Sequence, residues 1–447
     1  MDFSKIRDII VSAANDAGIE KYEIYCTTEE NIEAETLKHE ISSISSGMTG
    51  GVGFRCIVDG HMGYASTNSL DADELASLVT RAADNARVIE NDDEVFIFEG
   101  SESYAKTTAG EPTVTDAATL KECALKLQEK LYGYSEAVID GTQSAAISFV
   151  SEIYLYNSYG LELTNKVGMS GSYASAVISV DGEKQSGFEF AFGTDGEGVD
   201  ALPAKAVDGA IEKIGAGFVE SGKYDIVLSG KQMRTILSAY SSVFSAKNAQ
   251  MGLSLLAGKE GEKIASDIVT ITDDPMREGC PVQTAFDGEG VAAYKKNVVE
   301  NGVLNTLLYD LKTAKKAGKT TTANGQRGSY ASQVHIAPYN FSISAGENTF
   351  DELFAAVGNG IYITELKGLH AGADPVTGDF SIESAGFKIE DGKKAGAVKT
   401  FTIAGNFFTL LKSITMVADK VEWGIPGGFT VFGSPAVLVE GISVAGK

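Results

Sequence analysis

Four dipeptides of the Asp-Gly or Asn-Gly type interrupt alternating apolar sequence, and they constrain the fold more than any other feature. They stand at Asp59-Gly60, Asp181-Gly182, Asn301-Gly302 and Asp391-Gly392. A two-residue hairpin turn needs a positive φ at its central residues, which Asn, Asp and Gly adopt at low cost. Each dipeptide therefore predicts a tight β-hairpin. Two of them lie in each half of the chain, so antiparallel sheets are expected throughout.

Apolar residues at helical spacing predict helices between these strands. The expected helices span about 6–13, 71–89, 115–132, 201–214, 231–246, 351–357 and 407–417. Helices rarely alternate one-for-one with strands, which favours an α+β fold with antiparallel or mixed sheets and flanking helices over a doubly wound parallel sheet. At 447 residues the chain is long enough for two domains. We place an N-terminal α+β domain at 1–220 and a β-rich C-terminal domain at 221–447.

Charge and cysteine usage exclude several classes of protein. A net charge of -24 repels phosphate backbones, so direct nucleic-acid binding is not expected. The four cysteines are far apart and form no CxxC pair, which predicts buried reduced thiols. Charged residues interrupt the apolar positions near the N-terminus, so no signal peptide or membrane span is predicted. A cytoplasmic location is expected.

The stretch from Thr364 to Asn406 has polar and glycine residues at positions where an ordinary strand-forming core would place apolar ones. Its candidate site residues are His370, Asp374, Thr377 and Asp379, and the carboxylates of Asp287 and Glu289 are further candidates for a substrate or partner cleft. Turn chemistry alone also explains such residues, because Asp, Thr and Gly favour loops. An independent hydrolase that uses the cluster from His370 to Asp379 stays open as an alternative.

Other catalytic motifs are absent from the sequence. Its four histidines, at positions 39, 61, 335 and 370, include no pair one helical turn apart, which disfavours a zinc site built by this chain alone. No convincing nucleophile elbow is found, and the glycine-rich segments lack the Lys and Ser/Thr of a phosphate-binding loop. Turns explain those segments better.

Several longer segments can be compared with known families, among them GVGFRCIVDGHMGYAST, LYNSYGLELT, FDGEGVAAYKKNVVENGVL, TELKGLHAGADPVTGDFSIESAGFKIEDGK and FTIAGN. Together they resemble the TldD/PmbA family, first described as modulators of DNA gyrase and later as metallopeptidase subunits. They cover most of the chain. The resemblance implies the two-domain fold of that family and a role in proteolysis of unfolded or leader peptides.

The same resemblance implies a non-catalytic role for this chain. The catalytic TldD branch carries an HExxxH zinc helix, and an ungapped placement assigns Ser238, Ala239 and Val243 to its first His, its Glu and its second His. The corresponding helix contains neither His nor Glu, as in the PmbA branch, also called TldE. We therefore expect no cofactor in this chain, and zinc in a TldD-like partner subunit. A peptide-binding or regulatory homodimer without protease activity is the alternative, and a homodimer is also expected for the isolated chain.

Overall fold

The computed structural model describes residues 1–90 and 94–447, and these form two compact units. Unit 1 contains residues 1–211 together with 278–293 and 326–335. Unit 2 contains residues 212–277, 294–325 and 336–447. Neither unit is continuous in sequence, because two later segments of the chain belong to unit 1.

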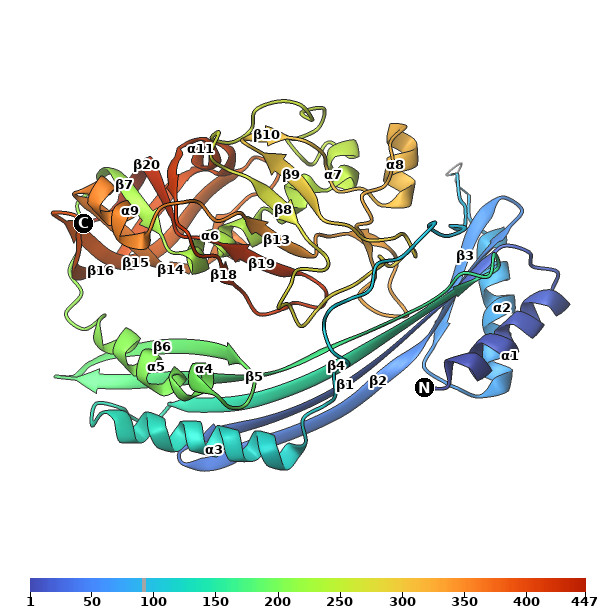
Figure 1. Cartoon of the computed structure of the whole chain (residues 1–447), viewed down its shortest axis with the longest axis horizontal. Helices are drawn as coiled ribbons and strands as arrows, with labels where there is room; N and C mark the ends of the chain where they lie inside the picture. The colour runs from blue at the N-terminus through green and yellow to red at the C-terminus, as the bar shows by residue number, and fades with distance from the viewer. Residues whose placement is uncertain (91–93) are drawn as a thin grey trace. The chain divides into compact units, whose positions relative to one another are not determined.

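Unit 1 is built on one antiparallel sheet of six strands in the order β3-β2-β1-β4-β5-β6. Its four central strands are unusually long and run together as a curved sheet (Figure 1). The strands are β1 (Tyr22–Leu37), β2 (Glu40–Val58), β3 (His61–Thr67), β4 (Gln143–Asn157), β5 (Glu162–Val180) and β6 (Glu183–Phe192). Regular pairing along β1, β4 and β5 places alternate side chains on opposite faces.

Helices cover one face of this sheet. They are α1 (Phe3–Asp16), α2 (Ala72–Arg87), α3 (Ala117–Tyr134), α4 (Glu197–Asp200) and α5 (Leu202–Ile211). Ile24 and Cys26 of β1 pack in one core with apolar residues of α1 and α2. Further along β1, Thr36 faces Gln128 of α3 on the same side of the strand. Asp116 caps α3 by accepting hydrogen bonds from two backbone amides.

All four predicted hairpin turns are present. They connect β2 to β3, β5 to β6, β9 to β10 and β15 to β16, and their eight central residues have φ between 48° and 84°. A fifth turn of this kind connects β1 to β2, where Lys38 and His39 have φ of 54° and 67°. No Asn or Gly marks that turn, so the sequence did not predict it. It joins β1 and β2, two of the four long central strands of unit 1.

Unit 2 contains two six-stranded sheets. The first has the order β10-β9-β8-β13-β19-β18, and the second has the order β16-β15-β14-β7-β20-β17. An additional pairing of β16 with β20 closes five strands of the second sheet into a ring. Two parallel pairs, β7 with β14 and β13 with β19, lie among antiparallel ones. These mixed sheets confirm the predicted α+β class.

The remaining strands have the following bounds. The first sheet of unit 2 contains β8 (Ile271–Asp273), β9 (Lys296–Glu300), β10 (Val303–Leu304), β13 (Asn340–Ile343), β18 (Glu422–Trp423) and β19 (Val431–Ser434). The second contains β7 (Gly222–Leu228), β14 (Gly360–Lys367), β15 (Asp379–Glu390), β16 (Lys393–Asn406), β17 (Ile414–Val417) and β20 (Val437–Ala445). A two-stranded ladder is formed by β11 (Gly325–Gln326) and β12 (His335–Ile336).

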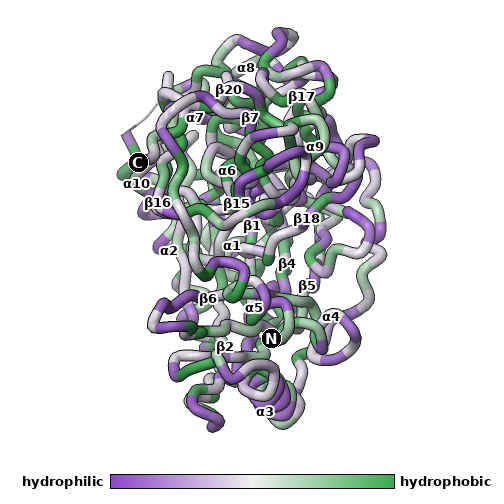
Figure 2. The backbone as a smooth tube through the Cα atoms, turned by 90° about the vertical axis from the view of Figure 1, so that its left-hand side faces the viewer, coloured by the Kyte–Doolittle hydropathy of each residue, from purple (hydrophilic) through white to green (hydrophobic). Residues whose placement is uncertain are grey.

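The helices of unit 2 are short. They are α6 (Gly230–Ala239), η1 (Ser241–Phe244), α7 (Ala246–Gln250), α8 (Leu311–Ala317), α9 (Phe350–Val357), α10 (Leu369–Gly372) and α11 (Phe407–Lys412). Apolar residues of β7 and α6 enter one large buried core, and the hydrophobic stretches in Figure 2 run through this region. Thr349 and Glu352 cap α9 by reciprocal hydrogen bonds.

Two predicted helices are corrected by the structure. The helix expected over 231–246 ends at Ala239 and is followed by the separate 3₁₀ turn η1. The helix expected over 407–417 ends at Lys412, and β17 follows, because the β-branched residues Ile414, Thr415 and Val417 favour a strand. None of the helices in the described ranges combines the length and apolar character needed to cross a membrane. All four cysteines are buried free thiols.

Candidate functional site

The loop that carries His370 and Asp374 is held by its own turn chemistry. His370 lies on α10 and is exposed. One carboxylate oxygen of Asp374 accepts hydrogen bonds from the backbone N–H of Val376 at 2.9 Å and of Thr377 at 3.4 Å. The Val376 amide is the main reason why the pKa of Asp374 is lowered, and the Thr377 contacts add to the effect. Asp374 therefore acts as a turn residue in its charged form.

Asp379 closes the same turn. Its backbone N–H donates to the Thr377 hydroxyl at 3.2 Å, and its carboxylate accepts from the Asn406 side-chain amide at 2.9 Å. That amide also donates to the Thr377 carbonyl at 2.9 Å. Gly378 has φ of 82°, and a Cβ there would lie 2.9 Å from the Asn406 side chain. Only glycine fits this position without strain.

Helix α6 is bonded to β14, the strand before the loop, and to Asp379 at the end of the loop. The Gln232 side-chain amide donates to the carbonyl of Thr364 at 2.6 Å. The hydroxyl of Tyr240, the residue that caps the end of α6, donates to the carbonyl of Asp379, also at 2.6 Å. The Tyr240 ring stacks on Phe407 with centroids 4.6 Å apart and planes 5° from parallel. Burial raises the pKa of Tyr240 to about 12, so its hydroxyl remains a donor at neutral pH.

The three zinc-helix positions lie at the end of α6. Ser238 and Ala239 are the last two residues of the helix, and both are partly exposed. Val243 lies in η1 and is fully buried in the core of unit 2. The chain leaves the helix between them, and the Ser241 hydroxyl donates to the Ser238 carbonyl at 2.9 Å. The helical register that would align the three positions is therefore interrupted.

These residues do not fit a zinc ion. Zinc is bound by His nitrogen, Cys sulfur or carboxylate oxygen in tetrahedral geometry, and a hydroxyl, a methyl and an isopropyl group offer none of these. Throughout residues 1–90 and 94–447, no group of three or more His, Cys, Asp and Glu side chains converges as a metal site. The arrangement at the end of α6 can hold a loop in place, but it supplies no ligands for a metal.

Asp287 and Glu289 belong to unit 1, whereas His370, Asp374, Thr377 and Asp379 belong to unit 2. Both carboxylates are buried. One oxygen of Asp287 accepts from the backbone N–H of Glu289 at 2.9 Å and of Val291 at 3.0 Å. Asp287 therefore organises a turn of its own. Asp374, Thr377 and Asp379 are connected by hydrogen bonds in one turn, and His370 lies on the preceding helix α10. Asp287 and Glu289 instead act on the charge of Arg55 in unit 1.

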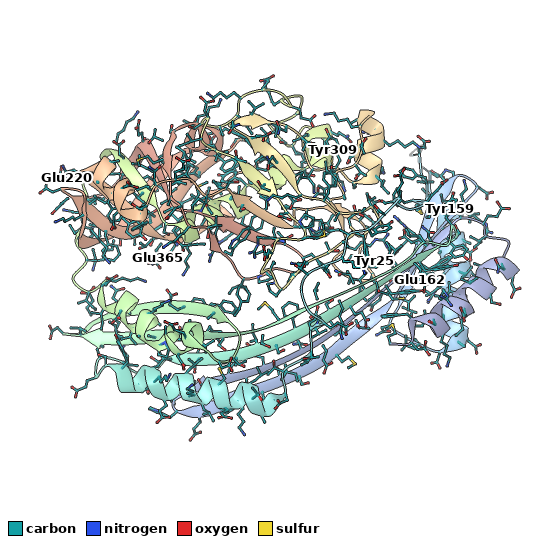
Figure 3. All side chains as sticks on the ribbon, viewed as in Figure 1. Tyr25, Tyr159, Glu162, Glu220, Tyr309 and Glu365 are labelled. Carbon is teal, nitrogen blue, oxygen red and sulfur yellow. The ribbon has the colours of Figure 1, made fainter. Side chains whose placement is uncertain are left out.

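A buried charge cluster in unit 1 was missed by sequence reasoning. Glu23 of β1 is fully buried and accepts a hydrogen bond from Arg55 at 2.8 Å and another from Arg327. The Arg327 guanidinium also lies 4.4 Å above the Tyr25 ring, which is labelled in Figure 3. Burial alone would raise the pKa of Glu23, but the charges of Arg327 and Arg55 outweigh it and lower the pKa.

The cross-strand position of Arg55 next to Glu23 follows from hairpin register, but nothing local points to Arg327. It is 304 positions away in sequence and is carried by one of the two segments that join unit 1 late. The only signal in the sequence was therefore a charged residue, Glu23, in an alternating strand. That signal does not identify Arg327 as its partner.

Comparison with known protein families gives matches over most of the chain. The PmbA/TldA metallopeptidase C-terminal domain matches residues 221–446, domain 1 matches 22–86, and the central domain matches 110–214. The chain belongs to the PmbA/TldD family. The three matched ranges fall in the order that the family defines, and the family is one of metallopeptidase-like proteins.

Individual relatives agree with this membership. An uncharacterised protein of Methanocaldococcus jannaschii is 30% identical over 388 residues, which cover 86% of this chain and 88% of the relative. A protein of Methanothermobacter thermautotrophicus named metalloprotease is 29% identical over 401 residues, or 86% of this chain and 85% of that protein. Neither identity assigns a branch of the PmbA/TldD family.

Solved structures of family members have the same fold. A Thermotoga maritima protein described as a modulator of DNA gyrase superimposes with a TM-score of 0.89 at 28% identity, covering 99% of this chain and 100% of that one. TldE from Thermococcus kodakarensis superimposes with a TM-score of 0.87 at 22% identity, covering 98% and 99%. At that identity the second match shows the fold alone.

Proposed function

We propose that this chain is a non-catalytic, PmbA/TldE-like subunit of a metallopeptidase complex. A TldD-like subunit would supply the zinc, and the complex would cleave unfolded or leader peptides. The observation that carries the proposal is the chemistry at the end of α6, where Ser238, Ala239 and Val243 stand at the positions that the family resemblance assigns to the zinc helix. These side chains provide neither metal ligands nor a general base.

The hydrogen bonds around α6 support a structural role for the same region. A metal-binding helix must keep its ligand side chains on one face over consecutive turns. Here the helix ends at Ala239, and the capping residue Tyr240 holds the backbone of Asp379. The end of the loop at Asp379 is therefore held by a side-chain hydrogen bond to its backbone, which does not depend on a bound ion.

A subunit without ligands can still contribute to peptide cleavage. It can exclude water from a partner's site and offer backbone donors and acceptors to an extended substrate. Glycine, serine and threonine suit such a surface because their small side chains allow a peptide backbone to approach closely. The segment from Thr364 to Asp379 contains three glycines and two threonines.

Zinc analysis and peptidase assays on two samples test the proposal. The samples are the isolated chain and the chain co-purified with a TldD-like subunit. We expect no stoichiometric zinc and no peptide cleavage in the isolated chain, and both in the complex. Stoichiometric zinc in the isolated chain, or failure of the two proteins to form a complex, would contradict the proposal. A metal-free homodimer that binds unfolded peptide would favour the alternative.

A further inference from the structure

One face of the unit 1 sheet carries aromatic side chains that the helices do not cover. The helices lie on the side of Gly187 in β6, where a Cβ would lie 2.0 Å from the carbonyl oxygen of Ala206 in α5. Side chains alternate along a strand, so Phe188, Phe190 and Phe192 point to the opposite face. Figure 1 shows that this face lies on the inner side of the curved sheet. Phe188 is 44% exposed and Phe192 is 43% exposed.

Strand register places two carboxylates on the same face. Glu33 of β1 pairs with Ile147 of β4, Ile147 pairs with Gly171 of β5, and Gly171 pairs with Phe192. Residues that pair in this way point to one side of the sheet, so Glu33 lies on the aromatic side. Three strand spacings, or about 14 Å, separate its backbone from that of Phe192. Glu35 follows two residues later on β1 and points to the same side.

Tyr173 of β5 connects the aromatic rings to the carboxylates. The centroid of its ring lies 5.5 Å from that of Phe188, and its hydroxyl donates to Glu35 at 3.2 Å. Ala145 of β4 stands between Tyr173 and Glu35 in the register, and its small side chain leaves room for the tyrosine ring. The connected surface is called the acidic-aromatic face below, and its members are Glu33, Glu35, Tyr173, Phe188, Phe190 and Phe192.

The two carboxylates have no cation beside them. Glu35 accepts hydrogen bonds from the hydroxyls of Ser43 and Tyr173. In the part of the chain that the structure describes, no Lys or Arg forms an ion pair with Glu33 or Glu35. Burial raises the pKa of Glu33, and the charge of Glu35 raises it further. A positive ligand group would relieve this repulsion, and the net charge of -24 would attract it.

A cavity of about 500 Å³ lies at the Phe192 end of this face. It adjoins the part of β5 that β6 does not reach, since the pairing of these strands ends at Gly171. Phe192 lines the cavity together with Met169, Gly193 and Pro281. Its volume is within the range of small-ligand sites and is sufficient for a large apolar side chain. The face is therefore acidic at one end and apolar at the other.

We propose that the acidic-aromatic face binds an extended segment of an unfolded peptide through one basic and one large apolar side chain. The basic side chain pairs with Glu33 and Glu35, and the apolar side chain packs on Phe192 beside the cavity. An extended chain advances about 3.4 Å per residue, so a span of about 14 Å corresponds to about four residues. The two side chains are therefore about four positions apart in the peptide.

The size and shape of the face favour a peptide over a folded partner. A stable contact between folded proteins takes about 20–30 residues from each side, whereas this face is made by six and lies inside the curve of the sheet (Figure 1). An extended peptide can follow such a surface with few contacts. The inference rests on the proposed function only for the kind of peptide, and the alternative peptide-binding homodimer would use the same segment.

Peptide binding to the isolated chain tests the acidic end. The probe is a labelled nine-residue peptide of Gly and Ser with Arg at its third position and Leu at its seventh, followed by fluorescence anisotropy. We expect Glu33→Gln to weaken binding about tenfold, because it removes one of the two negative charges. Glu30→Gln is the matched control, since it removes the same charge from the opposite face of β1 and should leave the affinity unchanged.

The same assay tests the apolar end. Phe192→Ala should also weaken binding about tenfold. Phe218→Ala is its control, because Phe218 is 45% exposed but belongs to unit 2. A probe with Glu in place of Arg should bind the wild-type chain at least tenfold more weakly, a comparison that needs no protein variant. Thermal unfolding checks that each variant is folded.

Two results would overturn the proposal. The first is equal affinity of the wild-type chain for the Arg and Glu probes, or of Glu33→Gln and Glu30→Gln for the Arg probe. The second is loss of co-purification with a TldD-like subunit in Glu33→Gln while peptide affinity is unchanged, which would identify the face as a subunit contact. The peptide measurements need neither zinc nor a TldD-like subunit. Their failure therefore leaves the zinc and peptidase tests of the proposed function unaffected, and the reverse also holds.

Discussion

The Tyr240 hydroxyl donates a 2.6 Å hydrogen bond to the backbone carbonyl of Asp379. This contact links the end of α6 to the loop that contains His370, while Gln232 of the same helix binds Thr364 in β14, the strand before the loop. One short helix thus contacts both β14 and the end of the loop that follows it. The conformation of the loop should therefore depend on α6 even though α6 carries no metal ligand.

Removing the Tyr240 hydroxyl should loosen this loop. Tyr240→Phe keeps the ring that stacks on Phe407 but removes one of the two donors to the Asp379 carbonyl, which still accepts from the Asp374 backbone N–H at 2.9 Å. We expect a loss of about 1 kcal/mol in the free energy of unfolding, the usual cost of one such bond. Hydrogen exchange should increase at the amides between Asp374 and Asp379. Tyr159→Phe, at an exposed tyrosine of unit 1, is the matched control and should change neither quantity. Unchanged exchange in Tyr240→Phe would show that the loop does not need this contact.

Gly378 should be intolerant of a side chain. Gly378→Ala forces a Cβ into a backbone with φ of 82° and to within 3.0 Å of Asn406 and Phe408. We expect a destabilisation of roughly 1–2 kcal/mol, measured by thermal or denaturant unfolding. Gly396→Ala is the control, because no atom lies within 4 Å of its Cβ and its φ is not in the left-handed region. Equal stability of the two variants would contradict the prediction.

Neutralising Glu23 should destabilise unit 1 strongly. Glu23→Gln preserves the shape of the side chain but removes the buried carboxylate that Arg55 and Arg327 share, so that near Arg55 only the charges of Asp287 and Glu289 remain. Breaking one partner of a buried ion pair typically costs about 3–5 kcal/mol. Denaturant unfolding of the full chain measures this loss. Glu29→Gln, at an exposed position of the same strand, is the control and should have little effect.

The same cluster should make stability depend on pH. The pKa of Glu23 is lower in the folded chain than in the unfolded chain, so folding favours its charged form. Its contribution is complete above the ordinary glutamate pKa of about 4.3 and is lost as the pH falls through the lower, folded value. The difference in unfolding free energy between wild type and Glu23→Gln should therefore be largest near neutral pH and should shrink on acidification. A constant difference from pH 7 to pH 2 would exclude Glu23 as the titrating group.

The sequence predicted the fold class and the hairpins because both depend on local chemistry. Asp-Gly and Asn-Gly dipeptides predict tight turns because these residues adopt positive φ at low cost. The turn at Lys38 and His39 has the same geometry without those residues, so its two long strands impose a conformation that the dipeptide does not favour. The early end of α6 was missed for a similar reason. Tyr240 leaves the helix to stack on Phe407, a partner far away in sequence.

The candidate site was predicted less completely than the fold. Turn chemistry groups His370, Asp374, Thr377 and Asp379 in one short stretch, and the structure places them in one loop. Their anchors, Gln232 and Tyr240, are more than a hundred positions away along the chain and carry no motif. Long-range hydrogen bonds of this kind arise from the packing of whole elements. The periodicity of a single sequence does not predict such long-range hydrogen bonds.

The two late segments of unit 1 set a limit on when this unit can complete its fold during synthesis. Glu23 is among the first residues made, whereas its second cation, Arg327, emerges from the ribosome only after most of the chain. N-terminal domains usually fold while later residues are still being added. Here the long sheet must remain unfinished, with a buried acid only half neutralised, until translation has passed through a large part of unit 2. The first strand to be made is therefore among the last to reach its final surroundings.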